Sequence, residues 1–112
     1  MAATPSPKHS PLQTEVLKIK NQIDTMIAHM QRKNDYSPTR DDLEYCAEEL
    51  ITLLNKYKEK TAPNERFLKT AVIDLTEVPD MAPQMQRISF LTALRDASAN
   101  IDQYLNSLPD HP

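Results

Sequence analysis

The chain of 112 residues contains no glycine and nine prolines, and this pairing limits what it can fold into. Glycine is the usual residue where the backbone takes a positive φ or approaches a phosphate closely. Phosphate-binding loops, dinucleotide fingerprints and the nucleophile elbow of α/β-hydrolases all depend on glycine, so none of these motifs occurs here. Two-residue β-hairpins also lose their preferred residues. We therefore expect a helical protein whose helices end at prolines, and a binding module rather than an enzyme.

The composition favours a single small domain of an intracellular protein. The formal net charge is −3, whereas nucleic-acid-binding domains are typically basic, so we do not expect a nucleic-acid partner. Cys46 is the only cysteine, which excludes an intramolecular disulfide and fits a reducing compartment. Residues 1–11 lack the apolar core of a signal peptide, and no run approaches the roughly 20 apolar residues of a membrane span. We expect a nuclear or cytoplasmic location and no membrane partner.

Apolar residues recur at helical spacing in four segments of the chain. The clearest stripe repeats every three or four residues near the N-terminus, at Leu12, Val16, Ile19, Ile23, Met26 and Met30. The helices predicted in this way cover about 11–33, 40–60, 64–76 and 81–108. Amphipathic helices with short connections favour an all-α fold, an antiparallel bundle of four helices. We assign residues 10–108 to this domain and expect disordered tails at 1–9 and 109–112.

Capping residues support the predicted helix starts. Ser10 precedes the first helix, and Thr39 with Asp42 three residues later has the spacing of a capping box before the second. Asp80 is the predicted N-cap of the last helix, with Pro83 tolerated in its first turn. Between the second and third helices, residues 61–64 (TAPN) are expected to break the chain without adding a helix.

The residue types needed for catalysis or metal binding are sparse. His9, His29 and His111 are scattered, and they do not form a close ligand set with Cys46, which lies on an apolar helix face. The carboxylates at the start of the second helix fit a solvated face that matches the helix dipole. We therefore expect no catalytic residue, no cofactor and no metal site.

Two loops are the candidates for binding another protein. In an up-down bundle, the loops at 34–39 and 76–83 lie at the same end. A concave apolar seat with acidic rims suits a short, partly basic peptide. The candidate partner-binding residues are Asn34, Asp35 and Tyr36 in the first loop, and Thr76, Glu77, Val78 and Met81 in the second.

Residues 37–40 (SPTR) match the pattern phosphorylated by proline-directed kinases. Ser37 stands just before the second predicted helix, and a phosphate there would face a helix N-terminus. Ser-Pro is also ordinary chemistry for a helix start. Ser37 is therefore a candidate phosphosite and its modification a hypothesis.

A structural subunit is the alternative function. The long apolar stripe of the first helix could pair with a second chain, as a homodimer or a hetero-oligomer, instead of packing inside one bundle. In an interaction module this stripe packs inside the bundle, whereas in a structural subunit it packs against another chain. Ile23→Asp would unfold a closed bundle but would mainly dissociate an assembly.

Two segments resemble a known class of interaction domain. Residues 42–50 (DLEYCAEEL) and 67–75 (FLKTAVIDL) are similar to helices of small interaction domains typified by the amino-terminal domain of elongation factor TFIIS and the integrase-binding domain of lens epithelium-derived growth factor. The resemblance covers residues 12–108. It implies that loops 34–38 and 76–83 dock disordered partner motifs in transcription or chromatin complexes. The chain departs from this class in showing no extra short helix after residue 60, and no aromatic residue in the second loop, where Val78 stands nearest.

Overall fold

The computed structural model describes residues 11–33 and 37–108. Four long helices are present: α1 (Pro11–Arg32), α2 (Arg40–Lys56), α4 (Glu65–Thr76) and α5 (Pro83–Ser107). Within these described ranges no strand occurs, so the all-α prediction is confirmed. The predicted tails at 1–9 and 109–112 lie outside them, as does Ser10.

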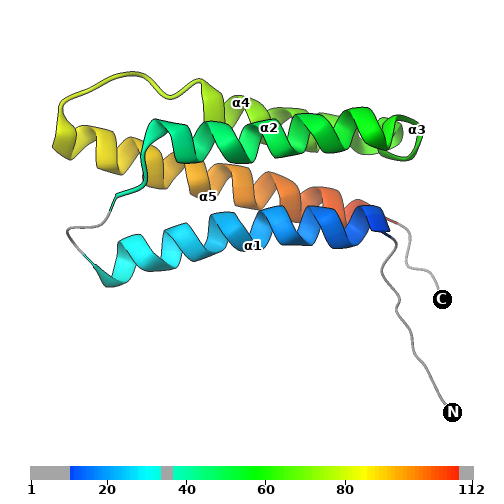
Figure 1. The fold of residues 1–112 in the computed structure, drawn as a ribbon, viewed down its shortest axis with the longest axis horizontal. Coiled ribbons are helices and arrows are strands. Elements are labelled where there is room, and N and C mark those ends of the chain that lie inside the picture. The colour runs from blue at the N-terminus through cyan, green and yellow to red at the C-terminus, as the bar shows by residue number, and fades with distance from the viewer. Residues whose placement is uncertain (1–10, 34–36, 109–112) are drawn as a thin grey trace, which may run out of the picture.

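The four long helices form a ring of antiparallel neighbours (Figure 1). α1 packs on α2 and α5, and α4 packs on the same two helices from the other side. In Figure 1, α2 and α4 lie above α1 and α5, and the starts of α2 and α5 lie at the same end of the bundle. The side of the ring between α1 and α2 is therefore opposite the side between α4 and α5.

A short helical elbow after α2 differs from the predicted simple break. Tyr57 leaves the helical region, with φ −114° and ψ 41°, and is followed by α3 (Lys58–Thr61) and the 3₁₀ turn η1 (Ala62–Asn64). Thr61 is fully buried, and its hydroxyl donates to the carbonyl of Tyr57 at 3.0 Å. This local bond satisfies the buried hydroxyl and holds the elbow closed.

The stripe on α1 faces the core of the bundle. Leu12, Val16, Ile19, Ile23 and Met30 are each at most 4% exposed and join one cluster with buried residues of α2, α4 and α5. Full burial of such a side chain is worth about 1.5–3 kcal/mol. A seam with a second chain along this stripe would require the bundle to open.

The helix caps were predicted in part. The capping box of α2 is confirmed, because the Asp42 N–H donates to Thr39 Oγ1 at 3.3 Å and the Thr39 N–H donates to Asp42 Oδ2 at 2.8 Å. Pro83 lies in the first turn of α5, as expected. The prediction that Asp80 caps α5 is wrong, since the N-cap is Ala82 and makes no side-chain cap. The carboxylate of Asp80 pairs with Arg40 instead.

Candidate functional site

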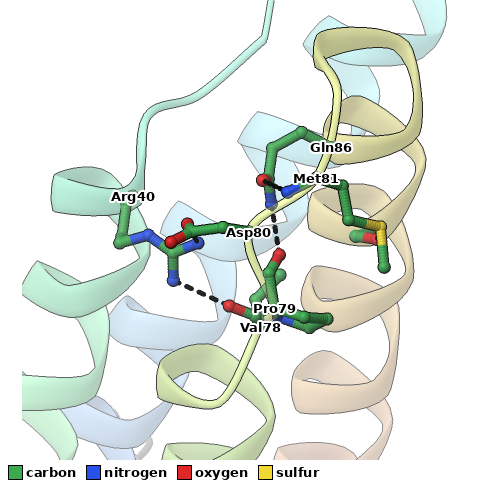
Figure 2. A network of polar contacts seen from close by, with 7 residues as sticks. Arg40, Val78, Pro79, Asp80, Met81 and Gln86 are labelled. Atoms are coloured by element: carbon green, nitrogen blue, oxygen red, sulfur yellow. Dashed lines mark hydrogen bonds and ion pairs between the residues drawn. The ribbon is translucent and has the colours of Figure 1, made fainter.

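Arg40 joins the start of α2 to the loop between α4 and α5. Its Nη1 donates to the carbonyl oxygen of Val78 at 2.9 Å, and its Nη2 lies 2.6 Å from the Asp80 carboxylate (Figure 2). The guanidinium carbon also lies 5.8 Å from the centre of the Phe90 ring of α5. One side chain of α2 therefore fixes the loop and reaches the helix that follows it.

Gln86 braces the same loop from α5. Its Oε1 accepts a hydrogen bond from the Met81 N–H at 2.9 Å, and its Nε2 donates to the Pro79 carbonyl at 3.1 Å (Figure 2). Exposed loop backbone ordinarily bonds to water, but three backbone polar groups of this loop, including the Val78 carbonyl, have protein partners instead. The loop therefore keeps one shape without any glycine.

A hollow between α4 and α5 begins at this loop. Its volume is about 380 Å³. It is lined by Ile73, Asp74 and Glu77 of α4, by Val78 and Pro79 of the loop, and by Ile88, Ser89, Thr92, Ala93 and Asp96 of α5. We call this the α4–α5 hollow. Ile73 is 49% exposed and Ile88 57% exposed, so two large apolar side chains stand open to solvent at its walls.

The residues predicted for the second loop meet this hollow in different ways. Glu77 and Val78 line it. Met81 is exposed, and its Sδ accepts a hydrogen bond from the hydroxyl of Ser89, a lining residue, at 3.1 Å. Thr76 lines no part of it, and its hydroxyl donates to the carbonyl of Val72 at 2.8 Å.

One of these predictions needs correction, and others fall outside the structure. As a candidate binding residue, Val78 was predicted to lie exposed in the loop, but it is only 8% exposed, because its side chain packs into the core cluster while its carbonyl accepts a hydrogen bond from Arg40. Asn34, Asp35 and Tyr36 lie outside the described residues. Ser37 is exposed and its hydroxyl donates to the Pro38 carbonyl at 3.2 Å, so its modification stays a hypothesis.

The α4–α5 hollow carries negative charge that its own lining does not neutralise. Asp74, Glu77 and Asp96 are among its lining residues, and no lysine or arginine is. Partial burial raises the pKa of Asp74 and the negative charge of Asp96 adds to this, while a 2.7 Å hydrogen bond from Asn100 Nδ2 opposes it. A cation supplied by a ligand would relieve this unfavourable burial of charge.

Ile88, an apolar wall of the hollow, was missed because helical spacing groups it with Met85 among the apolar positions of the predicted last helix, which were expected to be buried. Both are exposed, at 53% and 57%. A helical projection could have separated them: Ile88 precedes the buried Phe90 by two residues and therefore lies across the helix from it. Met85 lines no part of the hollow. Ile73 carries the same signal, since it precedes the buried Leu75 by two residues on α4.

The structure gives no sign of a reactive cysteine or of a metal site among the described residues. Cys46 is 1% exposed, and burial, with help from the charges of Glu49 and Asp42, raises the pKa of its thiol to about 11. Such a thiol stays protonated at neutral pH and is a poor nucleophile. In the part of the chain that the structure describes, no group of acidic, histidine or cysteine side chains could hold a metal ion. In that same part, no helix is long and apolar enough to cross a membrane.

Comparison with known proteins adds no relative. The chain matches no family model, no curated protein and no solved structure.

Proposed function

We propose that this protein is a non-enzymatic interaction module that binds a short peptide of a partner protein in the α4–α5 hollow. The observation that carries the proposal is the exposure of Ile73 and Ile88 beside the carboxylates of Asp74, Glu77 and Asp96. The peptide that fits this surface has one or two apolar anchors with lysine or arginine beside them.

The energetics favour such a ligand. An apolar anchor that covers Ile73 and Ile88 stabilises the complex by about 25 cal/mol for each Å² of apolar surface that it removes from water. Lysine or arginine beside it gains charge-assisted hydrogen bonds to carboxylates that have no basic neighbour in the lining. Because Arg40 and Gln86 already hold the loop, little ordering is needed when the peptide binds.

We place this interaction in a transcription or chromatin complex. The resemblance of residues 42–50 and 67–75 to TFIIS-type interaction domains suggests a disordered partner in a transcription or chromatin complex. In this reading Glu77 and Met81 contact the peptide directly. Asn34, Asp35 and Tyr36, which lie outside the described residues, are proposed to extend this contact. A nuclear or cytoplasmic location belongs to the same proposal.

Self-association is the weaker alternative. The α1 stripe, which could have formed a seam between subunits, is buried in the bundle apart from the partly buried Met26. A two-fold dimer built on the α4–α5 hollow would bring together two copies of Asp74, Glu77 and Asp96, since a two-fold interface uses the same patch twice. Their repulsion disfavours such a dimer.

The proposal can be tested by selecting peptides from a display library of disordered protein segments on the folded domain. We expect enrichment of peptides with apolar anchors flanked by basic residues. Ile88→Gln should abolish their binding. Ile51→Gln, a matched change at an exposed isoleucine of α2 that lines none of the hollows described, should leave it intact. Enriched peptides that bind both variants equally would overturn the proposal.

A further inference from the structure

A longer groove runs along the opposite side of the bundle, between α1 and α2. These helices pack on each other less closely than either packs on its other neighbour. The space between them has a volume of about 790 Å³. A second hollow of about 410 Å³ shares the lining residues Lys18 and Tyr45 with it. We call the two together the α1–α2 groove.

The groove is mainly apolar along its floor. Leu17 and Met26 of α1 and Cys46 of α2 line it, and the exposed ring of Tyr45 forms part of the α2 wall. The α1 wall of the larger hollow extends from Thr14 to Met26, which at 1.5 Å per residue is about 18 Å of helix. That length corresponds to roughly three turns of a helix laid beside α1.

The two walls differ in charge. Asp42, Glu48 and Glu49 of α2 line the groove on one side. On the α1 side Lys18 is the basic residue, and Glu15 is engaged by Tyr57 Oη at 2.6 Å and Lys56 Nζ at 3.2 Å. The α2 wall is therefore acidic from Asp42 to Glu49 and carries one lysine, Lys56, at the end of α2.

We infer that the α1–α2 groove is the docking site for an amphipathic helix of a partner protein. The apolar face of this partner helix covers Leu17, Met26 and Tyr45. A row of lysine or arginine beside that face lies against the carboxylates of α2. A helix fits better than an extended peptide, because a groove between helices offers no strand edge to pair with. The bound segment becomes a fifth long helix on the least closely packed side of the bundle.

This site is separate from the proposed peptide site. The α1–α2 groove and the α4–α5 hollow lie on opposite sides of the ring and share no lining residue. The protein can therefore hold a helix on one side and a short peptide on the other. The failure of either proposal leaves the other intact.

The probes for this inference are three synthetic 18-residue helical peptides. One has a leucine stripe flanked on one side by lysine, the second has glutamate in place of lysine, and the third has serine in place of leucine. Fluorescence anisotropy gives the affinity, and backbone amide shifts give the location. We expect only the lysine peptide to bind in the micromolar range, with shifts centred on Leu17, Asn21 and Tyr45.

Charge variants on α2 and filling variants on α1 are the matched controls. Glu48→Lys should weaken the lysine peptide at least tenfold, while Glu44→Lys, an exposed change on the same helix outside the groove, should not. Asn21→Trp should block the groove, whereas Gln31→Trp on the same helix should not. Both positions are exposed, so the fold is retained.

Other outcomes count against the inference. Equal binding of the lysine and glutamate peptides, no binding at millimolar concentration, or shifts confined to the α4–α5 hollow would each overturn it. Ile88→Gln should leave binding of the lysine peptide in the groove unchanged. Light scattering of the protein alone should give a monomer, and a dimer that Asn21→Trp dissociates would assign the groove to a second copy of the chain instead.

Discussion

The guanidinium of Arg40 donates a 2.9 Å hydrogen bond to the main-chain carbonyl of Val78, which lies 38 positions further along the chain. The bond ties the start of α2 to the loop that borders the α4–α5 hollow (Figure 2). The guanidinium of Arg40 also pairs with the carboxylate of Asp80, whose side chain is 93% exposed. The two contacts of Arg40 should therefore contribute differently to the free energy of unfolding.

Arg40→Ala is expected to destabilise the protein by about 1–2 kcal/mol, since it removes a hydrogen bond from a charged donor to the chain. Asp80→Ala should cost less than about 0.5 kcal/mol, because exposed ion pairs contribute little. Urea unfolding of both variants measures this difference. An equal loss in the two variants would show that the ion pair, and not the bond to Val78, holds the loop.

Two tyrosine hydroxyls should respond oppositely to removal. Tyr104 is fully buried in α5, and within the described residues its hydroxyl has no hydrogen-bond partner. Tyr104→Phe removes this unsatisfied group, so we expect unchanged stability or a gain of up to about 1 kcal/mol. Tyr57→Phe removes the 2.6 Å bond to Glu15 and should cost about 1 kcal/mol. Thermal unfolding of the pair tests this, and a loss on Tyr104→Phe would reveal a partner for its hydroxyl.

Asp74→Asn should stabilise the domain slightly at neutral pH. The pKa of Asp74 is raised in the fold from its ordinary value of 3.8, so the folded state binds its proton more tightly than the unfolded chain. The stability due to this group therefore falls as the pH rises from 3.8 through the raised pKa. The gain on substitution should be full at pH 7 and vanish below 3.8. Unfolding curves across this range check the sign, and a gain that grows toward low pH contradicts it.

Much of the fold could be predicted because the signals were local. The α1 stripe and the Thr39–Asp42 capping box depend only on residues close in sequence, and both are in the structure. Asp80 was misassigned because the competing partner, Arg40, is brought to it only by the tertiary fold. The short elbow was not predicted, because the hydrogen bond of the buried Thr61 hydroxyl forms only once the chain has turned.

The candidate site was predictable only in outline. The placement of loop 76–83 beside the start of α2 followed from alternating helix directions, and Glu77 followed from its position in that loop. Asp96 lies 13 residues after Pro83, the first residue of α5, and meets Asp74 only across a helix interface, which sequence spacing does not reveal. The α1–α2 groove exists because α1 and α2 pack loosely on each other, and the closeness of helix packing cannot be predicted from the amphipathic pattern of either helix.

The affinity of a display-selected peptide for Asp96→Lys and for Asp102→Lys tests the central claim most directly. Both aspartates are exposed on α5, and only Asp96 lines the α4–α5 hollow. If the hollow binds a basic peptide, reversing the charge at Asp96 should weaken binding about tenfold or more, roughly 1.4 kcal/mol, and the change at Asp102 should not. Equal affinities for the two variants would show that the peptide binds elsewhere and would contradict the proposed function.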